Sequence, residues 1–235
     1  MGLAELFLIA WQGILSNRLR SGLTVLGIVI GIASVITLMG IGEGAKLEAE
    51  KQVQALGVNL IYIRPGSSGT SGVSMGQGTA PTLTYEDVLA IKENCPAAED
   101  VAAQYTSSFQ IQVGEKNTST TVVGTDPSFP DIRNFHTAQG RFFTVQEAND
   151  SARVCAIGDG VVEDLFSGGA AIGKKMLIRG ELFTVIGVME HKGANATGDQ
   201  DDQVFIPIQT GYSTLFGLNL VSGRAVKSIL VQAKA

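Results

Sequence analysis

The sequence predicts an α+β protein in which one long apolar helix precedes a mixed region of helices and strands. The first observation is an uncharged run of 22 residues, Ser21–Gly42. The second is a series of short strand patterns, separated by turn residues, that fills most of residues 58–235. Helical stretches interrupt these strands without strict alternation, which argues against a doubly wound sheet with a cofactor site.

Residues 1–20 are predicted to form an amphipathic helix that lies in the inner membrane interface. At helical spacing, one broad face is apolar and carries Leu3, Leu6, Phe7, Ala10, Trp11 and Ile14. The opposite face carries Glu5, Gln12 and Ser16. Arg18 and Arg20 close the segment. A helix in this position could receive a push from a cytosolic partner, so Leu3, Leu6, Phe7, Trp11, Arg18 and Arg20 are candidate coupling residues.

Residues 21–42 are predicted to form a transmembrane helix, because about 20 apolar residues suffice to cross a bilayer core. Arg18 and Arg20 precede the run and Glu43 follows it. Lys and Arg beside a span tend to stay in the cytoplasm, so residues 43–235 are expected outside the inner membrane. A cleaved signal peptide is the main alternative, but its apolar region is shorter and ends in an A-x-A pattern that is missing here. A buried core helix is the weaker alternative.

One face of the predicted span is marked by small residues. Thr24, Gly27, Gly31, Ser34 and Leu38 follow one another at alternating spacings of three and four. The pair Gly27 and Gly31 forms a G-x-x-x-G motif, which lets helix backbones approach closely in lipid. This stripe is therefore a candidate packing seam against another transmembrane helix, although Gly is frequent in membrane spans generally.

After the span, residues 43–57 are predicted to continue as a helical stalk that stops at Gly57. The elements that follow are a strand at Leu60–Arg64, a Gly/Ser-rich loop at Pro65–Pro81 and a helix from Thr84 to about Asn94. Thr84 is expected to cap this helix, and the acidic residues Glu86 and Asp87 suit its first turn.

Strand patterns dominate the rest of the chain. They fall at Val101–Tyr105, Phe109–Val113, Ser119–Val123, Arg153–Ile157, Lys175–Ile178, Leu182–Val188, Gln203–Ile206 and Ser228–Gln232. The turn residues expected between them are Gly124, Gly140, Gly173, Gly180 and Gly193. One further helix is predicted at Gly160–Phe166.

Composition excludes several classes of protein. A net charge of −5 leaves no basic footprint for nucleic acid, and 6% aromatic residues provide no stacking platform for bases or sugars. Cys95 and Cys155 could pair outside the membrane, but Cys155 lies in an apolar strand and is more typical of a core residue. His136 and His191 show no metal-site spacing, so no metal or other cofactor is expected.

The sequence also lacks a coherent catalytic pattern. Asp199, Asp201 and Asp202 are acidic neighbours without EF-hand spacing, and a solvated loop is the favoured interpretation. His136 and His191 are expected to be surface or capping histidines. Nucleophile-elbow, zinc-protease and phosphate-loop motifs do not occur. The chain is therefore predicted not to be an enzyme.

A series of segments matches one known pattern in chain order. The segments are LxAWxxILSNRLRSGLTVLGIVIGIASVITLMGIGEGA, GVNLIYIRPG, LTYEDVLAI, VVGTDPSF, GRFFT, RVCAIGDGVVEDLF, AIGKKMLIRGELFTVIGVME and DDQVFIPIQT. Together they resemble permeases of the MacB type, in the FtsX-like group of ABC transporters. The resemblance covers essentially the whole chain, and the combined order of the segments is specific.

The resemblance implies a larger architecture. It implies four transmembrane helices, one before the outer domain and three after it, so the chain is expected to be a shortened permease. The outer domain would consist of a porter-like subdomain, residues 58–110 plus 226–235, and a β-rich, sabre-like insertion, residues 111–225. The implied partners are the lipid bilayer, a second permease copy, a separate ABC ATPase chain and, in some systems, a periplasmic adaptor of the membrane-fusion type; nucleic acid is not among them.

Two function classes follow. The first is a non-catalytic permease subunit that couples ATP hydrolysis on a cytosolic ATPase to motion of the extracytoplasmic domain, which is called mechanotransmission. The alternative is a single-span anchored adhesion or scaffold module without a role in transport. An anchored hydrolase is a third class, but it needs a catalytic constellation that the sequence does not show. The transported or sensed substrate is left open.

Overall fold

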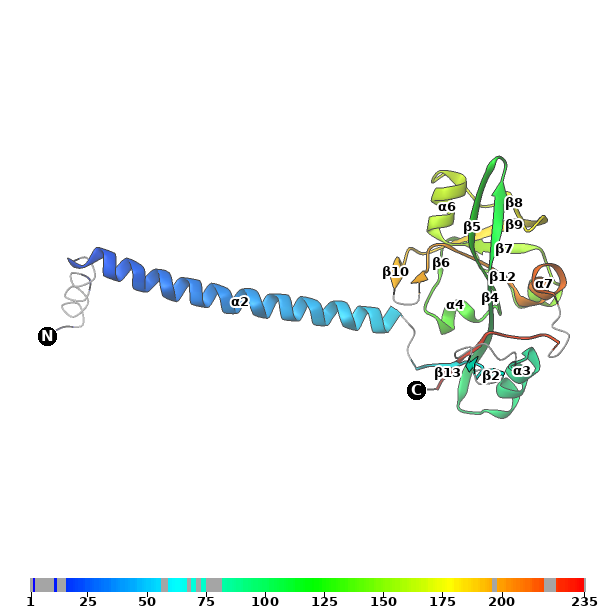
Figure 1. The fold of residues 1–235 in the computed structure, drawn as a ribbon, viewed down its shortest axis with the longest axis horizontal. Helices are drawn as coiled ribbons and strands as arrows, with labels where there is room; N and C mark the ends of the chain where they lie inside the picture. Colours follow the sequence, from blue (N-terminus) through cyan, green and yellow to red (C-terminus); the bar gives the residue numbers. More distant parts are fainter. Residues whose placement is uncertain are drawn as a thin grey trace. The chain divides into compact units, whose positions relative to one another are not determined.

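The computed structural model describes residues 2, 11, 16–55, 59–66, 69–70, 73–74, 82–195, 198–217 and 223–234. These residues divide into two compact units, Met1–Val53 and Gln54–Ala235 (Figure 1). The first is dominated by one helix and the second mixes helices and strands, which confirms the predicted α+β class.

The helix α2 runs from Arg18 to Ala55, and all but its last two residues belong to the first unit. Its part Arg18–Ala49 is long and apolar enough to cross a membrane. The helix contains no Pro and continues past Gly42 without a break, so the predicted helical continuation is confirmed as far as Ala55. The predicted stop at Gly57 lies outside the described residues.

The second unit is built on a nine-stranded mixed sheet of the described residues. Its strands are β1 (Leu60–Ile63), β4 (Ala98–Val113), β5 (Lys116–Thr125), β6 (Thr137–Gly140), β7 (Val154–Ile157), β8 (Lys175–Ile178), β9 (Glu181–Met189), β12 (Gln203–Pro207) and β13 (Ser228–Ala233). The order is β1-β13-β4-β5-β12-β7-β9-β6, and β8 pairs with β4 and β9. The pairs β5–β12 and β7–β9 are parallel, and the other pairs are antiparallel.

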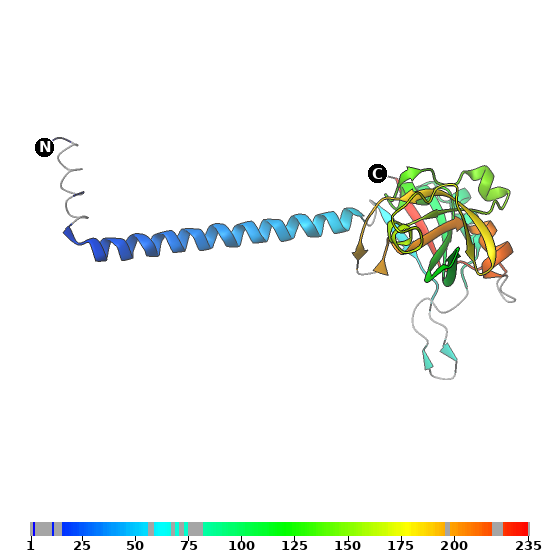
Figure 2. The same ribbon diagram turned by 90° about the horizontal axis from the view of Figure 1, so that it is seen from above.

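Two small strand pairs lie outside this sheet. They are β2 (Gly69–Thr70) with β3 (Val73–Ser74), and β10 (Ala194–Asn195) with β11 (Gly198–Asp199). The first pair lies away from the main sheet, within the stretch predicted as a loop (Figure 2).

One strand corrects the sequence prediction. The two strands expected at Val101–Tyr105 and Phe109–Val113 are one continuous strand, β4. The polar residues between them pair in register with β5, Thr106 with Val123 and Ser108 with Thr121, and no Gly or Pro interrupts them. Gly124, expected in a turn, lies inside β5 opposite Tyr105.

Other turn predictions agree better with the structure. Arg179 and Gly180 form the two-residue connection between β8 and β9, with φ of 52° and 87°. Positive φ at both positions is the requirement of a type I′ hairpin turn. Gly173 and Gly193 also have positive φ in connections, whereas Gly140 has positive φ as the last residue of β6.

The helices of the second unit are short. They are α3 (Tyr85–Asn94), α4 (Phe129–Ile132), α5 (Val145–Asn149), α6 (Asp159–Phe166), α7 (Ile208–Gly211) and the π-helical turn η1 (Tyr212–Phe216). The predictions of α3 and α6 are confirmed, with α6 beginning one residue earlier than expected. The helices α4, α5 and α7 were not predicted, because one turn of helix is too short to show a periodic pattern.

The core occupies both faces of the sheet because successive strand residues point to opposite sides. On one face, Val122 and Val204 pack beneath α6. On the other, Val123 and Phe205 pack against α4 and α5. A third cluster of buried residues places α3 and η1 on β4 and β13. Phe216 packs against the first and the third cluster and so joins them.

The predicted boundary between the two subdomains can be compared with the strands of the sheet. The predicted boundary between residues 110 and 111 falls inside β4, and residues 54–235 form one compact unit. The division into a porter-like part and a sabre-like insertion remains a prediction.

Candidate functional site

The predicted coupling residues are only partly described. Leu3, Leu6 and Phe7 lie outside the described residues. Trp11 is helical and 57% exposed. Arg18 and Arg20 lie in the first turn of α2, and both are exposed. In the part of this segment that the structure describes, the side chains are therefore open to lipid, solvent or a partner.

The predicted packing seam lies along α2 and is open over its whole length. Thr24, Gly27, Gly31, Ser34 and Leu38 are all exposed. A Cβ added at Gly27 or at Gly31 would meet nothing within 4 Å. The hydroxyls of Thr24 and Ser34 donate to the carbonyls of Arg20 and Ile30, at 2.9 and 2.7 Å. These hydroxyls are thus satisfied within the helix, so the stripe can face lipid or another helix at no polar cost.

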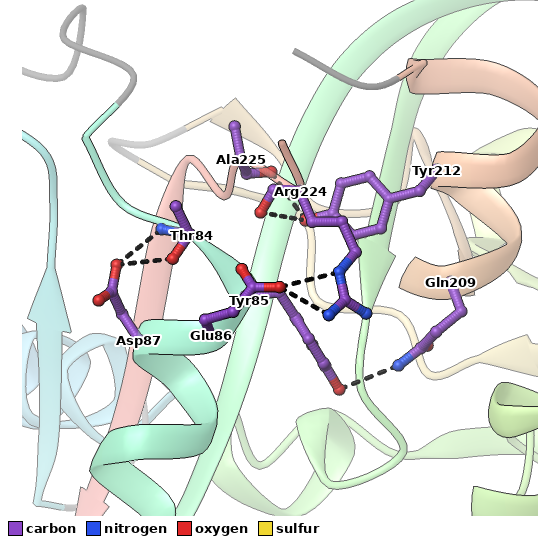
Figure 3. Close-up of polar contacts among 8 residues, drawn as sticks. All are labelled: Thr84, Tyr85, Glu86, Asp87, Gln209, Tyr212, Arg224 and Ala225. Atoms are coloured by element: carbon purple, nitrogen blue, oxygen red, sulfur yellow. Dashed lines mark hydrogen bonds and ion pairs between the residues drawn. The ribbon is translucent and has the colours of Figure 1, made fainter. Parts of the chain in front are cut away.

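In the second unit, a group of polar contacts surrounds the N-terminus of α3 (Figure 3). The Thr84 backbone N–H donates to the Asp87 carboxylate at 2.8 Å, and the two residues form a capping box. The predicted N-cap is therefore confirmed. This cap fixes where α3 begins, and with it the directions of Tyr85 and Glu86.

Two long-range contacts join α3 to the segment before β13. The Arg224 guanidinium donates to Oε1 of Glu86, at 3.1 Å from Nε and 2.6 Å from Nη2. Its Cζ also lies 5.3 Å from the centroid of the Tyr85 ring. The Tyr212 hydroxyl of η1 donates to the Ala225 carbonyl at 2.7 Å. Three elements that are distant in the sequence therefore meet at residues 224–225, as Figure 3 shows.

A buried carboxyl lies on the inner side of the same group. The Tyr85 hydroxyl donates to Oδ1 of Asp126 at 2.9 Å, and the Ala103 N–H donates to Oδ2 at 2.7 Å. Burial raises the pKa of Asp126, and these two donors act against that rise. The Gln209 amide donates to the Tyr85 hydroxyl at 2.9 Å, and its own Oε1 is buried without a partner among the described residues.

We call the residues Tyr85, Glu86, Asp126, Gln209, Tyr212 and Arg224 the α3 junction. It ties α3 to β4, to the start of β13 and to α7–η1. β13 in turn pairs with β1, the strand that follows α2 in the sequence. The junction therefore fixes the strand pair β1–β13 to the rest of the second unit.

One part of this junction is visible in the sequence, and the rest is not. Thr84 to Asp87 predicted a cap, whereas nothing near Arg224 indicated that it pairs with a residue 138 positions earlier. Asp126 follows β5 and precedes Pro127, and no sequence pattern singles it out. Its burial follows from the tertiary fold.

The acidic cluster corrects another expectation. Asp201 is 5% exposed rather than solvated. Its carboxylate accepts the backbone N–H groups of Lys192 and Gly193, at 2.9 and 2.8 Å, and lies 2.8 Å from Nδ1 of His191. By accepting these two backbone hydrogen bonds, Asp201 stabilises the connection between β9 and β12. His191 itself is exposed at the surface, as predicted.

The cysteines and histidines behave as structural residues. Cys155 is fully buried in the core and Cys95 is an exposed residue at the end of α3; both are free thiols. The prediction that Cys155 is a core residue is confirmed. No cluster of three His, Cys, Asp or Glu side chains suited to a metal ion occurs within the described ranges.

An apolar helix of membrane-spanning length followed by a mixed sheet is the arrangement of a membrane-anchored domain. The model of the MacB-like periplasmic core domain matches residues 21–235. The chain belongs to this family, which is one of ABC-transporter permease domains.

Relatives and solved structures agree with this assignment. The macrolide export ATP-binding/permease protein MacB of Bdellovibrio bacteriovorus is 36% identical over 211 residues, which cover 90% of this chain and 32% of that protein. The protein of the same name from Chlorobaculum tepidum is 37% identical over 214 residues, covering 91% and 33%. The chain thus spans about a third of the length of the curated relatives it matches.

Two solved structures share the fold. The periplasmic region of MacB from Actinobacillus actinomycetemcomitans aligns with a TM-score of 0.63 at 22% identity, over 77% of this chain and 78% of that one. The extracellular domain of the noncanonic ABC-type transporter YknZ from Gram-positive bacteria aligns with a TM-score of 0.60 at 19% identity, over 75% and 84%.

Proposed function

We propose that the chain is a non-catalytic permease part of an ABC-type export or mechanotransmission system. In this proposal, ATP hydrolysis on a separate cytosolic ATPase chain moves the extracytoplasmic domain. Family membership supports the permease class. The observation that supports coupling best is the short connection from α2 to β1, since α2 ends at Ala55 and β1 begins at Leu60.

The strand pairing would let a movement of α2 reach the sheet through β1. All four residues of β1 pair with β13, and β13 pairs with β4 in the middle of the sheet. Displacing β1 would therefore displace the sheet, because a hydrogen-bonded ladder is too stiff to absorb the movement locally. Mechanical coupling between the membrane helix and the sheet needs a continuous series of contacts, and these paired strands provide one within the second unit. The α3 junction also contacts β4 and the segment before β13.

The rest of the assembly follows from the same proposal. Residues 1–20 lie at the cytosolic face and receive the stroke through Leu3, Leu6, Phe7, Trp11, Arg18 and Arg20. The seam on α2 packs against another transmembrane helix, two permease copies form a dimer, and a periplasmic adaptor binds the outer domain. Residues 43–235 lie outside the inner membrane, because Arg18 and Arg20 favour the cytoplasmic side.

The first experiment tests the ATPase partner. The tagged chain is purified from native membranes in mild detergent, co-purifying ATPases are identified by mass spectrometry, and vanadate-sensitive ATP hydrolysis is measured. We expect Leu3→Ala/Phe7→Ala/Trp11→Ala to lower bound ATPase activity about tenfold, a loss of about 1.4 kcal/mol in binding. Glu5→Ala/Gln12→Ala/Ser16→Ala, on the opposite helix face, is the matched control. A chain that purifies without any ABC ATPase would favour the anchored scaffold instead.

The second experiment tests the coupling itself. Hydrogen exchange of the β1 and β13 amides is compared in the reconstituted complex with and without ATP and vanadate. We expect the exchange rates of these strands to change with nucleotide, and not to change when the ATPase cannot bind ATP. Identical exchange in both states would contradict the proposal.

A further inference from the structure

One face of the central sheet carries polar side chains over four strands, where they form the floor of an open cleft of about 630 Å³. These side chains are Gln104 and Thr106 on β4, Thr121 on β5, Gln203 on β12 and Ser228 on β13. Farther along the same face, Val123 and Phe205 are covered by α4 and its neighbours. The cleft therefore begins where that apolar cover ends.

The wall of the cleft is cationic and aromatic. The Arg133 guanidinium carbon lies 5.5 Å from the centroid of the Tyr62 ring, and the Arg64 guanidinium carbon lies 5.6 Å from the same centroid. Lys227 contributes to the lining of the cleft, but its Nζ lies 5.3 Å from the centroid of the Tyr105 ring, which belongs to the cluster on the opposite face of the sheet. Two guanidinium groups, those of Arg64 and Arg133, thus meet at one ring beside the opening.

Arg133 is the more informative of the two. It is half-buried, and that burial lowers the pKa of its guanidinium. Over the described ranges of the chain, its side chain has no carboxylate or carbonyl partner, and it stacks on the Tyr62 ring. A guanidinium has five N–H donors, and leaving them unmatched away from bulk water is costly. Stacking holds the planar fork in place without using those donors.

The acidic residues of the cleft form no ion pair with these cations among the described residues. Asp199 and Asp202 also line the cleft. Asp202 accepts the Thr120 hydroxyl, and Oδ1 of Asp199 accepts the Asp201 N–H at 2.9 Å. The Asp202 carboxylate is thus held by β5 and the Asp199 carboxylate by its own loop. Neither lies within ion-pair distance of Arg64, Arg133 or Lys227 in the described part of the chain.

We propose that this cleft binds a water-soluble ligand through a carboxylate or phosphate group. Arg133 holds the oxyanion in the bidentate manner that a guanidinium favours, and Arg64 adds charge. The hydroxyl and amide groups of the floor receive the polar remainder of the ligand. This inference is independent of the proposed coupling to an ATPase, since it concerns residues of the second unit alone.

The test uses the full chain in nanodiscs of phosphatidylcholine. Sodium phosphate and sodium citrate are titrated at constant ionic strength, and binding is followed by calorimetry and by the melting temperature. We expect saturable binding that weakens as salt is added. Arg133→Gln should weaken binding about tenfold to a hundredfold, as expected for the loss of charge-assisted hydrogen bonds. Arg133→Lys should fall between, because it keeps the charge but not the planar fork.

Two further variants distinguish a specific loss of binding from a loss that is caused by misfolding. Arg64→Gln changes an exposed cleft residue and should also weaken binding. Arg153→Gln removes the same charge from a side chain that pairs with Glu181 and does not line the cleft, so it should bind like the wild type. Unchanged binding by a folded Arg133→Gln chain, or no saturable binding of either anion at millimolar concentration, would overturn the proposal. Loss of anion binding in discs that contain phosphatidylglycerol would assign the site to a lipid headgroup and would also overturn it.

Discussion

The hydroxyl of Tyr85 donates a 2.9 Å hydrogen bond to Oδ1 of Asp126, a residue that is 8% exposed. Burial raises the pKa of this carboxyl above its ordinary value, despite the two hydrogen bonds it accepts. The folded state therefore holds the proton more tightly than the unfolded state does. By linkage, the contribution of Asp126 to stability is most favourable below the ordinary Asp pKa and declines as the pH rises through the raised pKa.

Asp126→Asn should remove this decline. An amide does not ionise, so the stability of the variant relative to the wild type should improve as the pH rises from the ordinary Asp pKa through the raised one. Rotation of the Gln209 amide would also let its unpartnered Oε1 accept from Tyr85, which leaves the new side chain able to donate. Denaturant unfolding at a series of pH values measures the difference. A difference that does not depend on pH would contradict the prediction.

Tyr85→Phe should make the loss of stability with rising pH larger, whereas Asp126→Asn removes it. It removes one of the two donors to the Asp126 carboxylate, so the pKa of Asp126 should rise further and the unfolding free energy at neutral pH should fall by about 1–3 kcal/mol. Tyr212→Phe is the matched control. Its hydroxyl donates to the Ala225 carbonyl, so its loss should cost stability without moving the pH dependence.

The α3 junction shows which parts of the structure were predictable. The N-cap Thr84 and the helix behind it depend on neighbours three positions apart, and such local patterns are visible in a sequence. The pair Glu86–Arg224 depends on β13 lying beside β4, which only the complete sheet brings about. The cleft residues Arg133 and Tyr62 are likewise 71 positions apart in the numbering and meet only through the sheet.

The wrong predictions have the same origin. Asp201 was expected in a solvated loop because acidic runs usually are solvated, but backbone donors of the β9 connection required an acceptor there. Gly124 was expected in a turn because Gly often ends a strand. Gly124 instead pairs inside β5 with Tyr105 and Ile206, and the ring of Phe216 leaves no room for a side chain there.

Gly124→Ala should therefore destabilise the second unit. A Cβ at this position would lie 2.5 Å from Cε2 of Phe216, well inside van der Waals contact. We expect a cost of about 1–3 kcal/mol from overpacking, measured as a lower melting temperature. Phe216→Leu in the same chain should relieve part of the clash, so the double variant should lose less than the sum of the two single variants. Gly66→Ala, which meets nothing within 4 Å, should be neutral.

A surface carboxylate provides a prediction at acid pH. Glu147 caps α5 through the Thr144 N–H at 2.9 Å and pairs with two nitrogens of Arg141, each at 2.7 Å. The guanidinium lowers the pKa of Glu147 to about 2. Because this pKa is depressed, its stabilising effect is present above the ordinary Glu pKa and is lost as the pH falls towards 2.

Glu147→Gln should accordingly reduce stability at neutral pH by up to about 1 kcal/mol, since Gln can still cap but cannot pair with Arg141 as an ion. The gap between variant and wild type should close as the pH falls from the ordinary Glu pKa towards 2. Denaturant unfolding across that range measures it. Glu181→Gln, which removes the carboxylate of the exposed Arg153 pair, should show a smaller gap. A gap that widens in acid would contradict this account.

The seam on α2 leads to the last prediction. Neither Gly27 nor Gly31 has any atom within 4 Å of the position of an added Cβ, so Gly31→Leu should leave the chain itself folded. If the stripe packs against a second copy of the chain, a Leu there should hold the two helices apart and weaken self-association about tenfold. Gly40→Leu is the control, because nine helical residues place Gly40 on the opposite face.

Energy transfer between labelled copies in lipid bilayers measures this association. Cys95 is exposed and Cys155 is fully buried with a raised thiol pKa, so a thiol reagent should label Cys95 selectively in the native chain. We expect energy transfer for the wild type and for Gly40→Leu, and a loss of it for Gly31→Leu. Equal transfer in all three chains, or equal loss in both variants, would mean that the small-residue stripe is not the contact surface. A Leu at position 31 prevents the close approach of two helix backbones on this face. The two variants should therefore differ in energy transfer only if the copies pack through this face.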